Sequence, residues 1–208
     1  MQTVNIRSLV FTALFAALFI VLSIQQLRIT ATPVPITFQT LAVILAGVFL
    51  RPGQAFASIW IVIALAAFGL PVFGGKGGIS HLIGATGGFI FAFPFCALLV
   101  SIAMNRLLGS ERIWRNKWLS ALLLFIVFEL FSSLLAYVTG VPWMMHVLNW
   151  SLDKALVYGF YPFLPGDAIK SAIGVLVTVS LHSYIKQLRA ASALRRPAAD
   201  SSATPVRG

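Results

Sequence analysis

The chain has 208 residues, of which 59% are hydrophobic and 10% are charged, whereas an average soluble domain has about 25% charged residues. A chain this apolar cannot bury its hydrophobic surface in one soluble fold, which argues against a soluble enzyme and excludes intrinsic disorder. The formal net charge of +10 indicates cationic loops at a membrane face, so no nucleic-acid partner is needed to explain it.

Long apolar runs recur along the chain, and a helix that crosses a bilayer needs roughly 20 mostly apolar residues. We predict an all-α integral membrane protein with six transmembrane helices, the second of them short. The predicted spans cover residues 8–27, 36–50, 54–70, 84–108, 118–138 and 166–185. The more polar stretch 141–164 is predicted to be a loop with a short helix.

Proline and glycine separate these runs. Pro33 and Pro35 end the first span, and the Pro52-Gly53 pair marks a tight turn before the third. A glycine-rich stretch, residues 69–78, follows the third span, and residues 140–165 form a second irregular connection. Irregular backbone near a membrane persists only where protein or water satisfies its polar groups, so these loops predict a cavity near one membrane face.

The distribution of basic residues predicts the orientation. With the N-terminus inside, most of the 15 Lys and Arg residues fall on the cytoplasmic side, and only Arg28, Lys76 and Lys154 fall outside. Both termini are therefore expected in the cytoplasm, with membrane lipid as a partner. Residues 1–189 are predicted to form one six-helix domain, and the Ala-, Ser- and Pro-rich residues 190–208 a disordered tail.

The sequence shows no motif for catalysis. It contains no phosphate loop, no zinc-protease motif and no nucleophile elbow, and its three histidines have no metal-ligand spacing. The single cysteine, Cys96, lies in an apolar run. We therefore expect no enzymatic activity, no cofactor and no metal, and any transport must draw its energy from a gradient or from another subunit.

Three ionisable residues, Glu129, Asp167 and Lys170, lie in predicted spans, where such residues are costly and usually functional. A Pro-Gly pair before Asp167 predicts a helix start with Asp167 at or next to the N-cap. The spacing of three places Lys170 on the same face, in a first turn whose dipole disfavours a cation, so Lys170 needs an anion nearby. Either an anionic solute from outside fills that need, or Asp167 is a capping residue paired with a lysine that reaches the headgroups. Glu129 is expected either to bind a proton or a basic partner, or to hydrogen-bond a neighbouring helix.

Four segments stand in a characteristic order: residues 33–41 (PVPITFQTL), 69–75 (GLPVFGG), 84–89 (GATGGF) and 165–170 (PGDAIK). Together they resemble the BioY family, the biotin-specific substrate-binding (S) components of energy-coupling-factor (ECF) vitamin transporters. The chain departs from the family pattern at Ala85, where the family usually has Pro, and at Phe89, where it often has Tyr. A polar role for position 89 is therefore not expected.

The resemblance implies an S component of the bacterial cytoplasmic (inner) membrane that captures biotin at the outer face. It implies three partners: a transmembrane coupling subunit, to which the stripe of Ala13 and Ala17 would dock, and two ATPase subunits. It also implies that Asp167 and Lys170 belong to the biotin site, which the loop after the first span and the glycine-rich stretches flank. The predicted substrate-binding residues are therefore Asp167, Lys170, Thr37, Gln39, Thr86, Gly87, Gly88, Phe89 and Phe73.

The chemistry of biotin suits these residues. Asp167 can accept from the ureido N–H groups, Lys170 can pair with the carboxylate, and Thr37, Gln39 and Thr86 can donate to the ureido carbonyl. Aromatic residues, among them Trp143 and Tyr161, can enclose the thioether ring. Three alternatives are an S component for another small anionic vitamin, a proton-coupled secondary transporter that uses Glu129, and a membrane scaffold without a ligand.

Overall fold

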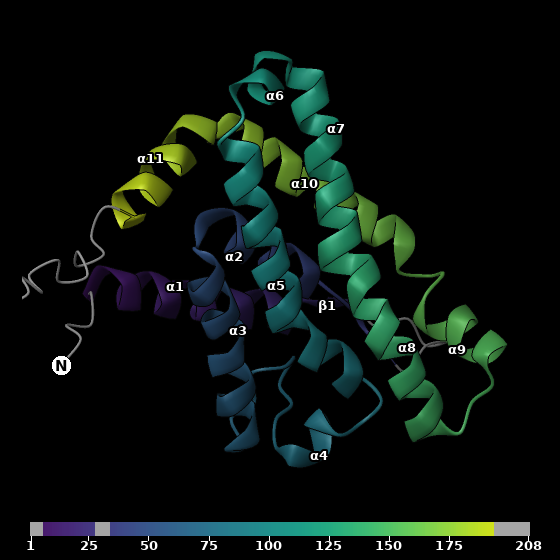
Figure 1. The fold of residues 1–208 in the computed structure, drawn as a ribbon. Helices are drawn as coiled ribbons and strands as arrows, with labels where there is room; N and C mark the ends of the chain where they lie inside the picture. The colour runs from purple at the N-terminus through teal and green to yellow at the C-terminus, as the bar shows by residue number, and fades with distance from the viewer. Residues whose placement is uncertain (1–5, 28–33, 194–208) are drawn as a thin grey trace, which may run out of the picture.

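The computed structural model describes residues 6–27 and 34–193, which are mostly helical (Figure 1). The long helices are α1 (Ile6–Ile24), α2 (Gln39–Phe49), α3 (Pro52–Ala67), α5 (Gly87–Leu108), α7 (Lys117–Phe128), α8 (Leu135–Leu148), α10 (Leu164–Ser180) and α11 (His182–Ala193). The short elements are β1 (Gln26–Leu27), β2 (Ile36–Thr37), α4 (Ile79–Leu82), α6 (Glu111–Arg115), α9 (Leu152–Gly159) and a π-helical segment, η1 (Glu129–Leu134).

Helix α5 is the centre of the bundle. It packs against α2 and α3 on one side and α8 on the other, and α10 crosses α2 and α7 (Figure 1). Apolar residues of α2, α3 and α5 are almost fully enclosed, among them Val43, Ile59 and Cys96. The core therefore lies along α5, and the loops at the ends of these helices are free to form a site.

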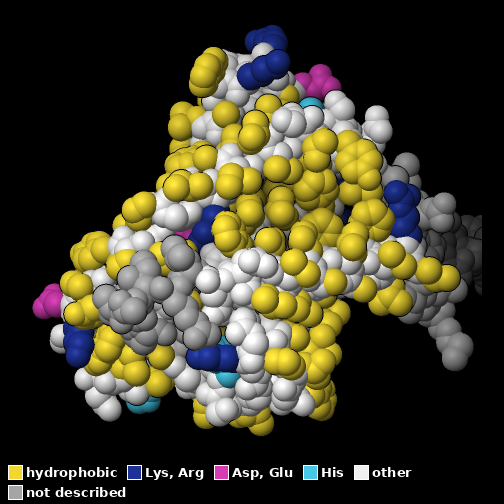
Figure 2. Space-filling view, turned by 180° about the vertical axis from the view of Figure 1, so that it is seen from behind, with side chains coloured by type: hydrophobic (Ala, Val, Ile, Leu, Met, Phe, Trp, Pro, Cys, Tyr) yellow, Lys and Arg dark blue, Asp and Glu magenta, His cyan; other side chains and the backbone are white. Residues whose placement is uncertain are grey.

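Apolar side chains cover much of the outside, as expected for a protein surrounded by lipid (Figure 2). Among the described residues, three continuous helical stretches are long and apolar enough to cross a membrane: Ile6–Ile24, Gly87–Leu108 and Lys117–Leu148. The bent pair α9 and α10, at 47°, adds a fourth if it forms one span, whereas α2 and α3 are shorter apolar helices. The all-α membrane fold is confirmed, while the six-span count and the position of both termini stay predictions.

The predicted end of the fifth span is wrong. Residues 141–148, assigned to a loop, continue α8 as far as Leu148, and only α9 corresponds to the predicted short helix. Pro142 lies inside α8, where apolar surroundings and neighbouring helices tolerate it. Gly140 permits the close packing that keeps this turn helical, because a Cβ there would lie 2.3 Å from the Phe89 ring.

The segments between helices follow the predicted interruptions. β1 pairs antiparallel with β2, with Gln26 opposite Thr37, and brings the ends of α1 and α2 together. The glycine-rich stretch turns back on itself between Phe73 and Lys76, and four of its glycines have positive φ. Pro33, the tail from residue 194 and Arg28 lie outside the described residues; residues 190–193 belong to α11.

A buried guanidinium joins three helices at the other end of the molecule. Arg189 of α11 donates to the carbonyls of Gly47, Val48 and Leu50 at 2.8–2.9 Å. It also donates to Ser101 and Asn105 of α5. Burial, with Arg51 nearby, lowers the pKa of Arg189 to about 10, so the group stays charged at neutral pH. This charge compensates the C-terminal carbonyls of α2.

Candidate ligand-binding site

A cavity of about 520 Å³ opens between the interrupted segments and the helices behind them. This volume falls in the range typical of small-molecule sites. The lining comes from β1, β2, the start of α2, the glycine-rich stretch, α4, the start of α5, η1, α8, the end of α9 and α10. Both predicted irregular connections contribute to this lining, the first through Phe73 and Lys76 and the second through Gly159 and Phe163, so the predicted cavity is present. Its position near a membrane face stays a prediction.

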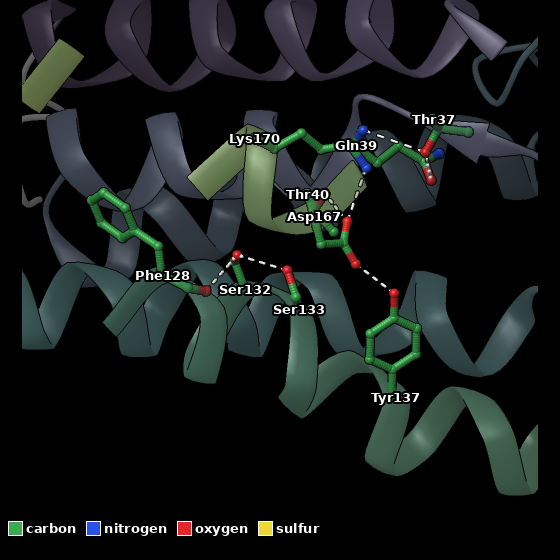
Figure 3. Close-up of polar contacts among 9 residues, drawn as sticks. All are labelled: Thr37, Gln39, Thr40, Phe128, Ser132, Ser133, Tyr137, Asp167 and Lys170. Carbon is green, nitrogen blue, oxygen red and sulfur yellow. Dashed lines mark hydrogen bonds and ion pairs between the residues drawn. The ribbon is translucent and has the colours of Figure 1, made fainter. Parts of the chain in front are cut away.

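Asp167 is the centre of the polar wall of this cavity (Figure 3). Its Oδ1 accepts from Lys170 Nζ at 2.9 Å and from Thr40 Oγ1 at 3.1 Å, and its Oδ2 accepts from the Tyr137 hydroxyl. The donors come from α10, α2 and α8, so three helices converge on one carboxylate. A carboxylate has about four acceptor sites, which leaves roughly one free on Oδ2.

The start of α10 places this carboxylate deeper than predicted. Phe163 is the N-cap, and Pro165 lies in the first turn, where its missing N–H costs no hydrogen bond. Asp167 is therefore one turn inside the helix, with its backbone N–H donating to Phe163 O at 2.9 Å. The prediction of Asp167 at or next to the N-cap is wrong, but the shared face with Lys170 is confirmed.

The anion that Lys170 needs is supplied by the chain itself. The Lys170–Asp167 ion pair measures 2.9 Å, and the two residues are only 6% and 2% exposed. A buried pair is costly unless further hydrogen bonds satisfy it, and Thr40 and Tyr137 provide two of them. Lys170 keeps two of its three N–H donors for other partners.

Most of the other predicted binding residues also line the cavity: Thr37, Gln39, Phe73, Thr86 and Phe89. Thr37 Oγ1 donates to Gln39 Oε1 at 3.0 Å, which orients the amide. The Phe89 ring meets Tyr137 edge-on at 5.8 Å between centroids, and Phe73 is 1% exposed. The site thus combines hydrogen-bonding groups on α2 and α10 with aromatic walls.

Gly87 and Gly88 have a packing role in this geometry and are not part of the lining. A Cβ on Gly88 would lie 2.4 Å from Trp143 Cβ, so the glycine lets α5 and α8 approach closely. Trp143 donates to Gly84 O at 2.9 Å and lies behind the wall rather than in it. Tyr161, 56% exposed, also lies outside the lining.

Several lining residues were not predicted from the sequence, chiefly Tyr137, Thr40, Ser133, Lys76 and His81. One signal was present. Glu129, Ser133 and Tyr137 recur every four residues along an apolar run, which predicts one polar face on that helix. The structure places Ser133 and Tyr137 on the cavity, whereas Glu129 lies outside its lining.

Glu129 begins the π-helical segment and is half-buried. Its Oε1 has no hydrogen-bond partner among the described residues, and neither has the buried Ser171 hydroxyl of α10. π-Helical turns occur often at functional sites. Both predicted roles of Glu129 stay predictions.

The predicted docking residues lie on the outer face of α1. Ala13 and Ala17 are exposed, whereas Ala16 and Phe19 of the same helix are buried. Ala16 accordingly serves packing within the chain, and the pair four residues apart is available to another helix.

Comparisons with known proteins agree with this geometry. The BioY family matches residues 1–187. The probable biotin transporter BioY of Bacillus subtilis is 36% identical over 81% of this chain and 87% of its own length. The biotin transporter BioY2 of Lactococcus lactis subsp. cremoris is 37% identical over 90% of this chain and 95% of its own.

A crystal structure of the S-component for biotin from an ECF-type ABC transporter has the same fold. Its TM-score is 0.73 at 27% identity, and the match covers 91% of this chain and 94% of that one. The resemblance seen in the four sequence segments thus extends over nearly the whole chain, and the protein belongs to the BioY family.

Proposed function

We propose that this protein captures biotin at the outer face of the bacterial cytoplasmic membrane, as the S component of an ECF-type ABC transporter. The observation that carries the proposal is the Asp167–Lys170 pair, buried in the wall of a cavity of about 520 Å³. Relatives named as biotin transporters and the biotin S-component structure support the choice of vitamin.

The polar wall suits the cyclic urea of biotin. A urea presents a carbonyl between two N–H groups, and the pair presents the free N–H donors of Lys170 beside the remaining acceptor site of Asp167. Gln39 lines the cavity nearby, and its side-chain N–H groups, oriented by the hydrogen bond from Thr37 to its amide oxygen, can donate to the same carbonyl. A ligand without this donor and acceptor pattern would leave buried polar groups unpaired, which gives specificity.

The apolar walls suit the thioether ring and the alkyl chain of biotin. Phe73, Phe89, Phe93 and Phe163 line the cavity, and each is less than a tenth exposed. Removing the bicyclic ring from water against these side chains supplies the hydrophobic part of the affinity.

In such a transporter this chain would bind the substrate, and other subunits would supply the energy for transport. We propose that the exposed Ala13 and Ala17 on α1 receive the transmembrane coupling subunit, and that two cytoplasmic ATPase subunits drive release. The chain itself acts as a transporter component without enzymatic activity.

The proposal is tested by calorimetric titration of the detergent-purified protein with biotin, for the wild type, Lys170→Ala and the control Lys154→Ala. Lys154 is an exposed lysine outside the cavity lining. We expect tight binding by the wild type and the control, and at least about tenfold weaker binding by Lys170→Ala. No binding by a folded wild type would overturn the proposed function, and unchanged binding by Lys170→Ala would overturn the proposed site.

A second candidate function rests on the unpartnered carboxylate oxygen of Glu129, which would accept a proton in a proton-coupled transporter. Uptake of biotin into vesicles without ATPase subunits, driven by a pH gradient and abolished in Glu129→Gln, would favour it. Uptake that needs the ATPase subunits and is unchanged in Glu129→Gln would exclude it.

A further inference from the structure

The charge on the polar wall is already balanced. Lys170 and Asp167 form an ion pair at 2.9 Å, and within the described chain the cavity lining holds no further carboxylate. A ligand carboxylate placed on Lys170 would compete with Asp167 and would itself lose its water deep in the cavity. The wall is better suited to a neutral hydrogen-bonding group than to an anion.

A second cation lines the same cavity at its edge. Lys76 is an exposed residue, yet it belongs to the lining, so it lies where the cavity meets the solvent. No ion pair involves Lys76 in the part of the chain that the structure describes, where the pairs are Lys170–Asp167 and Lys186–Glu111. The charge of Lys76 is therefore available to a ligand.

The backbone of Lys76 is fixed to the cavity wall. Its N–H donates to Phe73 O at 3.0 Å, and its carbonyl accepts from Phe73 N–H at 2.9 Å. Phe73 is 1% exposed and lines the cavity. The side chain of Lys76 thus starts from a rigid two-residue turn and keeps only its own rotamer freedom.

The side chain of His81 lies close enough to Lys76 to be affected by its charge. Burial, and next the positive charge of Lys76, lower the pKa of His81, which also lines the cavity. His81 is accordingly neutral at neutral pH, and Lys76 carries the positive charge of this edge.

We propose that Lys76 is the electrostatic partner of the ligand's carboxylate, while the Asp167–Lys170 pair holds the ureido ring. This assignment rests on the proposed function, and it gives biotin one orientation in the cavity. The bicyclic ring lies inside against the aromatic walls, the alkyl chain runs outward, and the carboxylate stays near water. An anion held at this edge keeps part of its hydration, which avoids most of the cost of burying it.

The test compares biotin with its neutral amide, which differs only in the charged end. Affinities of the wild type, Lys76→Gln and the control Lys154→Gln are measured for both ligands. We expect the wild type and the control to prefer biotin by about fivefold, the size of an exposed ion pair. Lys76→Gln should lose this preference by weakening biotin alone, and higher salt should reduce the preference of the wild type.

The amide also reports folding, since its affinity should be the same in all three proteins. A preference for biotin that persists in Lys76→Gln would overturn this inference and leave the proposed function standing. A preference lost in Lys170→Met but kept in Lys76→Gln would assign the carboxylate to the polar wall instead. A folded wild type that binds neither ligand would overturn the proposed function and this inference with it.

Discussion

Asp167 accepts from three helices at once, so single donors can be removed while the carboxylate stays in place. The Tyr137 hydroxyl is the most instructive of them, because it reaches the carboxylate from α8, 30 positions away in sequence. Its removal leaves the aromatic contact with Phe89 intact and tests the hydrogen bond alone.

We expect Tyr137→Phe to weaken biotin binding by about tenfold, since a hydrogen bond to a charged group contributes roughly 1.5–3 kcal/mol. Calorimetric titration measures the change. Tyr158→Phe on α9, a tyrosine outside the cavity lining, is the matched control and should bind like the wild type. Equal affinities for the two variants would contradict a role for Tyr137 in orienting Asp167.

The buried Asp167–Lys170 ion pair should affect the free energy of unfolding. Lys170→Met leaves the buried Asp167 carboxylate without a compensating positive charge, and we expect it to destabilise the fold by about 3 kcal/mol. The double variant Asp167→Asn with Lys170→Met removes both charges and should recover much of this loss. Thermal unfolding in detergent measures both, and a double variant less stable than Lys170→Met would contradict the argument.

The ionisable residues of this site could be predicted from the sequence, whereas the neutral polar residues that bind them could not. Asp167 and Lys170 could be predicted because ionisable residues in an apolar run are conspicuous. Thr40 and Tyr137 could not, because a threonine and a tyrosine in a membrane helix have many ordinary uses. Their hydrogen bonds to Asp167 join residues that are 127 and 30 positions apart in the sequence. Only the packing of α2, α8 and α10 brings these residues together.

Among the elements, α1 has one face in the core and one face outside. The exposed face carries Ala13 and Ala17 together with large apolar residues such as Leu9 and Val21. The gap left by two small side chains on an otherwise bulky helix is suited to a close helix–helix contact.

We expect Ala17→Trp to abolish co-purification of the coupling subunit while biotin binding stays unchanged. The control Leu176→Trp places the same bulk on the exposed face of α10 and should retain the complex. Pull-down of the coupling subunit from detergent extracts, with biotin titration in parallel, measures both properties. A complex that survives Ala17→Trp would contradict docking at this stripe.

Element boundaries were predictable where the chain itself causes the break, and less so where packing decides. The turn before α3 and the glycine-rich stretch follow directly from Pro52 and from glycines with positive φ. The continuation of α8 past Pro142 could not be predicted, because it depends on Phe89 of another helix packing against Gly140. The start of α10 differs by a turn for a similar reason, since proline fits within a first turn as well as before it.

For the whole molecule, the clearest test concerns Arg189, whose guanidinium contacts α2 and α5 from α11. We expect Arg189→Met to destabilise the fold by about 3 kcal/mol, since several buried carbonyls lose a charged donor together. The control Lys186→Met breaks only an exposed pair of 3.8 Å with Glu111 and should change stability by less than about 1 kcal/mol. Thermal unfolding in detergent compares the two, and equal effects would contradict a special role for Arg189.

The contacts of the Arg189 guanidinium make one end of the helix bundle harder to separate than the other. Because Arg189 ties the last turn of α2 to α5 and α11, these three helix ends cannot separate without stripping a charged group of its partners. The opposite ends of α2 and α5 border the cavity, where β1 and β2 lead into α2 and residues 83–86 lead into α5. We therefore expect the two ends of these helices to differ in mobility: exchange of backbone amides should be slower at the helix ends that Arg189 holds than at the ends that border the cavity.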